Sequence, residues 1–128
     1  MVEFALVAPL VMALMFGMVE MGLALYTYHF VASAARQGAR YAIVRGAKCD
    51  SWASACPASA SDVQTYVRSL DPGAIDASSL NVTTSWSPDN SPGNRVTVTV
   101  QYAFGLNVPF ISAATLTMHS SSQMVVSQ

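Results

Sequence analysis

The most constraining feature of this 128-residue sequence is an apolar run near its start. From Phe4 to Tyr28, about 25 residues are mostly apolar, which is enough to cross the hydrocarbon core of a bilayer as a helix. Glu20 is the one formal charge in this run. An unpaired carboxylate in hydrocarbon is costly, so such residues tend to be functional and to have a partner. The run therefore predicts a membrane-type helix with one carboxylate that needs an explanation.

The helix is predicted to continue well past Tyr28. Gly46 is the first plausible terminator, and Pro9, although inside the helix, is tolerable in a membrane segment. One helix of about 43 residues is roughly 65 Å long, about twice the thickness of a bilayer core. Membrane anchoring alone is therefore an incomplete explanation. The continuation has a polar face made of His29, Ser33, Arg36 and Arg40.

The remaining residues predict a small α+β fold. Ser61 and Gln64 have capping-box spacing at the start of a short second helix, which Asp71-Pro72-Gly73 ends. Apolar residues alternate with polar ones over 80–86 and 96–104, joined by a hairpin loop, "SPDNSPGN". After a break at 105–109, "ATLTMHSSSQMVVSQ" supplies a third strand or a bulged ribbon. The expected domains are an N-terminal helix over 1–46 and a small extracytoplasmic α+β domain over 47–128, with a three-stranded antiparallel sheet.

Two cysteines, Cys49 and Cys56, are the only ones in the chain. Without nearby histidines they cannot close a zinc site, which takes four ligands. A local disulfide is the favoured interpretation, and two free buried thiols are the alternative. A disulfide indicates an oxidising compartment, outside the cytoplasm.

Composition and motifs argue against several functions. The net charge is -1 and charged residues make up 10% of the chain, so nucleic acid is not an expected partner. The sequence contains no phosphate loop, dinucleotide fingerprint or metal-binding spacing. His29 and His119 have no nucleophile motif or carboxylate cluster beside them in sequence. We expect no enzymatic activity, no cofactor and no metal.

Three sequence blocks carry a resemblance to a known family. "VEFALVAPL", "FGMVEMGLALY" and "AARQGARYA" together resemble the N-terminal half of TadE-like pseudopilins, components of bacterial Tad (Flp-type) pili. The tail "PFISAATLTMHSSSQM" is similar to the end of the same family. The resemblance implies a pilin-like fold and a precursor in the bacterial inner membrane. It also implies cleavage by a prepilin peptidase, handling by the pilus assembly machinery, and a final place in an extracellular pilus at the cell surface.

The sequence departs from the family at its start. In pilin-like precursors a basic leader ends in Gly, and the mature chain usually has Glu at its fifth position. Here the glutamate is Glu3 and no leader is present. Either two residues and a leader are missing from the quoted chain, or the mature form is cut at an unusual place. The arginines after Tyr28, taken alone, would put the C-terminal side in the cytoplasm. A lost basic leader and the disulfide favour the opposite orientation.

Two functional hypotheses follow, and a third is weaker. The chain is a structural subunit that assembles with copies of itself or with other pilins into a helical filament. Alternatively, it is a minor membrane-resident pseudopilin that primes or regulates a pilus made from another pilin. The weaker hypothesis is an ordinary single-pass membrane protein with an extracytoplasmic binding domain. The residues expected to act in assembly are Glu3, Pro9, Glu20, Arg36 and Arg40.

Glu20 has no cation within reach along its own helix. Positions 16, 17, 23 and 24 are Phe, Gly, Leu and Ala, and Arg36 lies about 24 Å further on. We therefore expect Glu20 to pair across subunits, with Arg36, Arg40 or a tyrosine hydroxyl of a neighbour. The alternative is that Glu20 stays protonated or reaches a water-lined gap. Glu3 is expected to meet a positive group at the head of the helix bundle.

Overall fold

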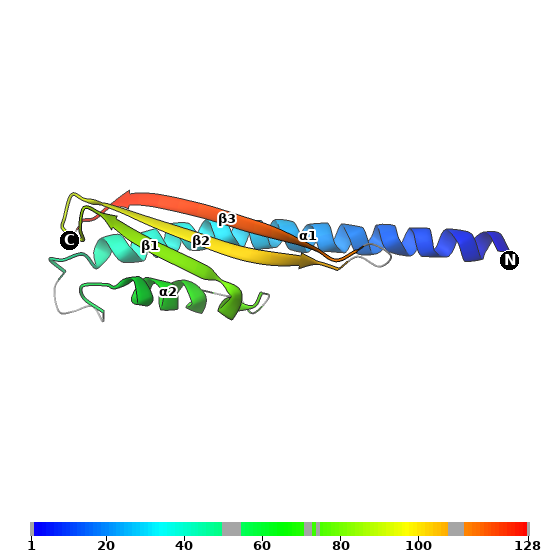
Figure 1. Ribbon diagram of the computed structural model, residues 1–128, viewed down its shortest axis with the longest axis horizontal. Coiled ribbons are helices and arrows are strands. Elements are labelled where there is room, and N and C mark those ends of the chain that lie inside the picture. The colour runs from blue at the N-terminus through cyan, green and yellow to red at the C-terminus, as the bar shows by residue number, and fades with distance from the viewer. Residues whose placement is uncertain (1, 50–54, 71–72, 74, 108–111, 128) are drawn as a thin grey trace.

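The computed structural model describes residues 2–49, 55–70, 73, 75–107 and 112–127. One helix, α1 (Val2–Val44, 43 residues), runs the whole length of the molecule. A three-stranded sheet and a short helix, α2 (Ala60–Ser69), gather along the C-terminal half of α1, and the N-terminal half projects beyond them (Figure 1). The expected α+β fold with a long apolar N-terminal helix, a short second helix and a three-stranded antiparallel sheet is confirmed.

The helix α1 ends close to the predicted terminator. Its last helical residue is Val44, and the chain turns through Arg45 and the buried Gly46. Pro9 lies inside α1 without ending it. The close approach of the C-terminal half to its neighbours depends on Gly38, because a Cβ there would lie 2.8 Å from Val67 Cγ2 and 3.1 Å from Val98 Cγ1. Glycine at this position lets α1 touch α2 and the sheet together.

The sheet is a simple antiparallel meander of β1 (Asn81–Ser87), β2 (Arg95–Leu106) and β3 (Ala114–Val125). Val98 of β2 pairs with Thr84 of β1 on one side and with Ser122 of β3 on the other. The hairpin loop between β1 and β2 is confirmed. The alternation along β2 buries Val96, Val98 and Val100 on the face towards α1.

The structure corrects one detail of the predicted strands and settles another. The expected break after residue 104 is wrong at Gly105, because β2 stays paired through Gly105 and Leu106. The remainder of that break, including Pro109, lies outside the described residues. The third segment is one continuous strand of 12 residues, whose register with β2 runs from Ala114 to Val125 without an interruption.

The start of α2 differs from the prediction. Ser59, not Ser61, is the N-cap: its hydroxyl accepts from the Asp62 backbone N–H, and the Asp62 carboxylate accepts from the Ser59 backbone N–H. This is a reciprocal capping box, with Asp in the position that Glu or Gln usually takes. The side of α2 that faces the core carries Val63 and Val67, which are fully buried. Residues 71 and 72, predicted to end the helix, lie outside the described residues.

One core joins α1 to the sheet and α2. It contains side chains from α1, from α2 and from the strands, most of them valine and alanine. The contribution of α1 begins near its middle, where the Thr27 side chain is buried and donates its hydroxyl to the Leu23 carbonyl at 2.8 Å. The core residues of α1 are Val31, Ala34, Ala35, Ala39 and Ala42. Among the residues that the structure describes, none in this core comes from the first half of the helix.

Candidate assembly surfaces

The first surface is the bare N-terminal half of α1. An 18-residue window of this helix has mean hydropathy 2.1, and none of that window is buried. Large apolar side chains are exposed all around it, including Phe4 (78% exposed) and Met18 (74% exposed). A helix that is apolar on every side is normally buried in a larger core or in a membrane. By length and composition, α1 is a candidate membrane-spanning helix.

Glu20 lies in this apolar half and is partly exposed. Within the described part of the chain, no group forms a hydrogen bond or ion pair with its carboxylate. Its neighbours one turn away along the helix are two large apolar residues, Phe16 and Leu23, and two small ones, Gly17 and Ala24. A Cβ added to Gly17 would meet nothing within 4 Å. Glu20 therefore lies among a mixture of large and small apolar side chains.

Glu3 and Pro9 lie further towards the N-terminus of α1. Glu3 is in the first helical turn and is exposed, where its charge is favourably placed relative to the helix dipole. Pro9 is also exposed. No described residue pairs with Glu3, so the expected positive partner at the head of a helix bundle stays a prediction.

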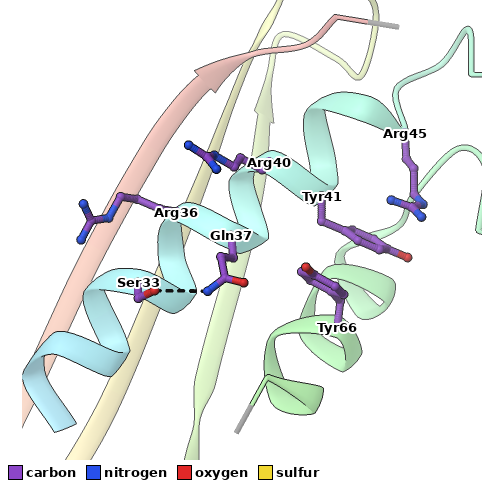
Figure 2. A pocket seen from close by; sticks show the side chains of 7 residues that line it. All are labelled: Ser33, Arg36, Gln37, Arg40, Tyr41, Arg45 and Tyr66. Carbon is purple, nitrogen blue, oxygen red and sulfur yellow. Dashed lines mark hydrogen bonds between the residues drawn. The ribbon is translucent and has the colours of Figure 1, made fainter. Parts of the chain in front are cut away.

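The second surface is a polar groove on the exposed side of the C-terminal half of α1. It is an open hollow of about 760 Å³ between α1 and α2. Three arginines contribute to its walls, and none of the described residues that line it is acidic. Figure 2 shows the residues of this arginine groove: Ser33, Arg36, Gln37, Arg40, Tyr41, Arg45 and Tyr66. The groove is a positively charged surface.

Aromatic contacts fix one end of the arginine groove. The rings of Tyr41 in α1 and Tyr66 in α2 stack with centroids 4.3 Å apart. The guanidinium carbon of Arg45 lies 3.9 Å from the Tyr41 ring centroid, a cation–π contact. Our sequence reasoning did not place Tyr66 or Arg45 in any site. The spacing of residues along α1 could not reveal this site, because Tyr66 belongs to α2.

Arg36 and Arg40 point away from this aromatic pair, towards the other end of the groove (Figure 2). Arg36 donates from Nε to the Ala32 carbonyl at 3.2 Å, and its outer nitrogens remain available. Arg40 is exposed and makes no polar contact with any residue that the structure describes. Neither arginine contacts Glu20 of its own chain. This agrees with the separation expected from their spacing along the helix.

Cys49 and Cys56 are bonded to each other, with Cα atoms 6.0 Å apart. The predicted local disulfide is confirmed and the free-thiol alternative is wrong. It closes the connection between α1 and α2. Backbone hydrogen bonds hold the same region: the Ala58 N–H donates to the Arg45 carbonyl at 2.9 Å, and the Ala47 N–H donates to the Asn90 carbonyl at 2.8 Å.

Three exposed carboxylates stabilise turns outside the apolar half of the helix. Hydrogen bonds from Ser59 lower the pKa of Asp62 below its ordinary value of 3.8. Hydrogen bonds from Ser78 and Ser79 lower the pKa of Asp76, and those from Ser91 and Asn94 lower the pKa of Asp89. These carboxylates cap α2, the short 3₁₀ turn Ala77–Ser79 and the β1–β2 loop, so their lowered pKa values reflect local structure.

The geometry defines a class of protein: a small α+β fold from which an apolar, candidate membrane-spanning helix projects. Residues 1–40 match the family model described as TadE-like protein. This match confirms the resemblance seen in the N-terminal sequence blocks, and it points to a component associated with Tad pili. No curated protein and no solved structure matches the chain.

Proposed function

We propose that this protein is a pilin-like structural subunit that assembles through α1 into a Tad-type pilus filament. The observation that carries the proposal is the bare apolar half of α1, which is exposed on every side while its C-terminal half forms the core of the small fold. Such a surface needs a bilayer before assembly and other helices afterwards. In this proposal the small α+β fold faces the outside of the cell, in keeping with its disulfide.

The proposal assigns a structural role to the residues of α1. The apolar half holds the precursor in the inner membrane, and the same side chains pack against neighbouring helices in the filament. The partners in the filament are copies of this chain or other pilins. A prepilin peptidase cleaves the precursor, and the pilus assembly machinery handles it. The polar strands face solvent, and no catalytic step is part of the role.

Filament composition tests the proposal. The gene for this protein is deleted in its host, and pili are sheared from deleted and complemented cells and quantified. A main subunit dominates sheared pili, and its deletion abolishes them. A protein that is scarce in pili, although its deletion abolishes them, is instead the minor priming pseudopilin. Unchanged pili without this protein contradict a role in assembly altogether.

Glu3 provides a residue-level test of the same proposal. Glu3→Gln keeps the shape of the side chain but removes its charge, so a partner at the head of the helix bundle is lost. We expect pilus yield to fall while the amount of protein in the membrane fraction is unchanged. Asp76→Asn, which removes a charge far from the apolar half, is the matched control. Normal pilus yield from Glu3→Gln would show that this carboxylate has no role in assembly.

A further inference from the structure

The end of the β2–β3 hairpin lies beside the middle of α1 and points towards the N-terminus of the helix (Figure 1). Residues of α1 and β3 line one open hollow of about 560 Å³. The lining includes Met21, Leu25 and Tyr28 from α1, and Leu116 and His119 from β3. The start of β3 therefore runs alongside the last eight residues of the apolar run, 21–28.

This end of the hairpin has open strand edges. β1 pairs with β2 only as far as Gln101, whereas β2 and β3 stay paired up to Leu106 and Ala114. Beyond Gln101, β2 has no described strand on its other side, and β3 is an edge strand of the described sheet. Thr117 and His119 also expose polar side chains there. Open strand edges do not occur within the hydrocarbon of a bilayer, because their backbone N–H and C=O groups would have no partner.

The hairpin therefore limits how much of α1 can lie in hydrocarbon. A span from Phe4 to Tyr28 is about 36 Å long, which exceeds the core thickness of about 30 Å. It would also place the open strand edges in hydrocarbon, and Glu20 about 12 Å inside the outer end of the span. A span between Glu3 and Glu20 avoids both costs. Its length is about 26 Å, a mismatch that extended side chains and local thinning of the bilayer accommodate.

From these observations we propose that the inserted protein has its outer hydrocarbon boundary at Glu20 and that the base of the fold lies in the phospholipid headgroup layer. This inference rests on the proposed function only for the insertion of α1 in a membrane. The base of the fold is the surface around the hollow between α1 and β3. It consists of Met21, Leu25, Tyr28, Leu116, Thr117 and His119.

The chemistry of the base matches a phospholipid. Met21, Leu25 and Leu116 are exposed apolar side chains, which suit the upper methylenes of acyl chains. The Tyr28 hydroxyl and the His119 ring are exposed beside them and can donate hydrogen bonds to phosphate and ester oxygens. Tyrosine is enriched at this depth because its ring is apolar and its hydroxyl is polar. The hollow also continues directly into the bare half of α1, so lipid that surrounds the helix reaches it.

The proposed boundary gives Glu20 a different role in the membrane from its role in a filament. At the boundary its carboxylate reaches headgroups and water, so the inserted protein needs no cation from a second copy. The carboxylate then ends the span instead of interrupting it, which removes the cost of a lone charge in hydrocarbon. Pairing of Glu20 across subunits becomes a matter for the assembled state alone.

Thiol labelling locates the boundary. Phe16→Cys, Leu23→Cys and His29→Cys are made singly, without reductant, since the native cysteines are bonded to each other. Phe16 and Leu23 are equally exposed in the fold, at 46% and 47%, so they form a matched pair on either side of Glu20. Host membranes freed of pili by shearing receive a membrane-impermeant maleimide, and each signal is normalised to the same variant unfolded in detergent.

The proposed boundary predicts similar labelling of Leu23→Cys and His29→Cys, and labelling of Phe16→Cys that is several times weaker. A boundary at Tyr28 instead leaves Leu23→Cys as shielded as Phe16→Cys, and that result would overturn the inference.

Fluorescence quenching tests the contact between the base and headgroups. The full-length protein carries a fluorophore on Leu116→Cys, in vesicles of phosphatidylethanolamine and phosphatidylglycerol with nitroxide on some headgroups. Val125→Cys is the control, because Val125 is an exposed apolar residue at the other end of the same strand. We expect quenching to be several times stronger at 116 than at 125. Equal quenching at the two positions would contradict the contact, as would stronger quenching at 116 by nitroxide deep on the acyl chains.

The outcomes separate this inference from the filament role. If the membrane-bound protein has Leu23→Cys shielded, the boundary is wrong and the filament role is unaffected. If labelling and quenching are as expected but deletion of the gene leaves pili unchanged, the contact with the bilayer stands and the filament role is wrong. If alkaline carbonate extracts the protein from host membranes, the contact and the membrane stage of the proposed function are both wrong.

Discussion

The effect of substituting a residue of α1 on the stability of the fold depends on where along the helix that residue lies. Gly22 and Gly38 are both helical glycines. A Cβ on Gly22 would meet nothing within 4 Å, whereas one on Gly38 would press on two buried valines. The difference follows from packing, because only the second half of the helix is inside the core. Position along the helix therefore decides which substitutions the fold can tolerate.

Gly38→Val is expected to destabilise the fold. Its branched side chain has to displace Val67 and Val98, and overpacking of this kind costs about 1–3 kcal/mol. Gly22→Val introduces the same side chain at an open site of the same helix and serves as the control. Chemical denaturation in detergent, followed by circular dichroism, measures both. Equal stability of the two variants would mean that α1 does not pack as closely at residue 38 as described.

Acid should weaken the start of α2. The pKa of Asp62 is lowered in the folded state by hydrogen bonds from Ser59, so the ionised form is favoured by folding. This contribution is fully present above the ordinary value of 3.8 and is lost as the pH falls through the lower, folded value. We expect Asp62→Asn to flatten the loss of stability below that pH. Melting curves between neutral pH and acid check it, with Asp62 carboxyl chemical shifts as the direct readout.

At the scale of elements, α1 belongs to two environments. None of the described core residues comes from its first half, while its second half packs against β2, β3 and α2. The Cys49–Cys56 disulfide and two backbone hydrogen bonds stabilise the turn after α1. One hydrogen bond joins this turn to Ala58, just before α2, and the other joins it to Asn90 in the β1–β2 loop. These bonds fix the position of α2, and α2 supplies the Tyr66 wall of the arginine groove.

Removing the disulfide should loosen the α1–α2 connection. Closing a loop of this length contributes roughly 2–3 kcal/mol by chain entropy. The double variant Cys49→Ala, Cys56→Ala is therefore expected to be less stable by up to about that amount. Proteolysis should nick it between α1 and α2 earlier than the parent. Matched stability with and without reductant in the parent protein would show that the bond constrains little.

At the scale of the whole molecule, α1 begins to contribute to the core near Thr27. The first described core residue is Thr27, and the chain before it contributes exposed apolar side chains. The segment from Val31 to Ala42 supplies one face of the core. The expected boundary between residues 46 and 47 stays a prediction, which truncation can test.

Two truncations should behave differently. Removing residues 2–25 takes away only the bare half of α1, so the remaining chain should fold and stay monomeric in water without detergent. Removing residues 2–46 also takes away Val31, Ala34, Ala35, Ala39 and Ala42, and it should leave an unfolded or aggregated product. Far-ultraviolet circular dichroism and the dispersion of amide proton shifts distinguish them. A folded 47–128 fragment would show that the sheet does not need α1.

The sequence alone determined the elements and their order, because long apolar runs, period-two alternation and turn residues are local signals. It also favoured the disulfide pair, since the chain has only two cysteines, and it indicated the isolation of Glu20, since helical spacing puts no cation near it. Local signals were ambiguous where they overlapped, so the cap of α2 moved from Ser61 to Ser59 and β2 continued through Gly105. Only the tertiary structure decided that α1 enters the core at Thr27. It also brought Tyr66 beside Tyr41 and left the Glu20 carboxylate without a polar partner among the described residues. Those relations depend on which elements pack together, and no run of neighbouring residues encodes that by itself.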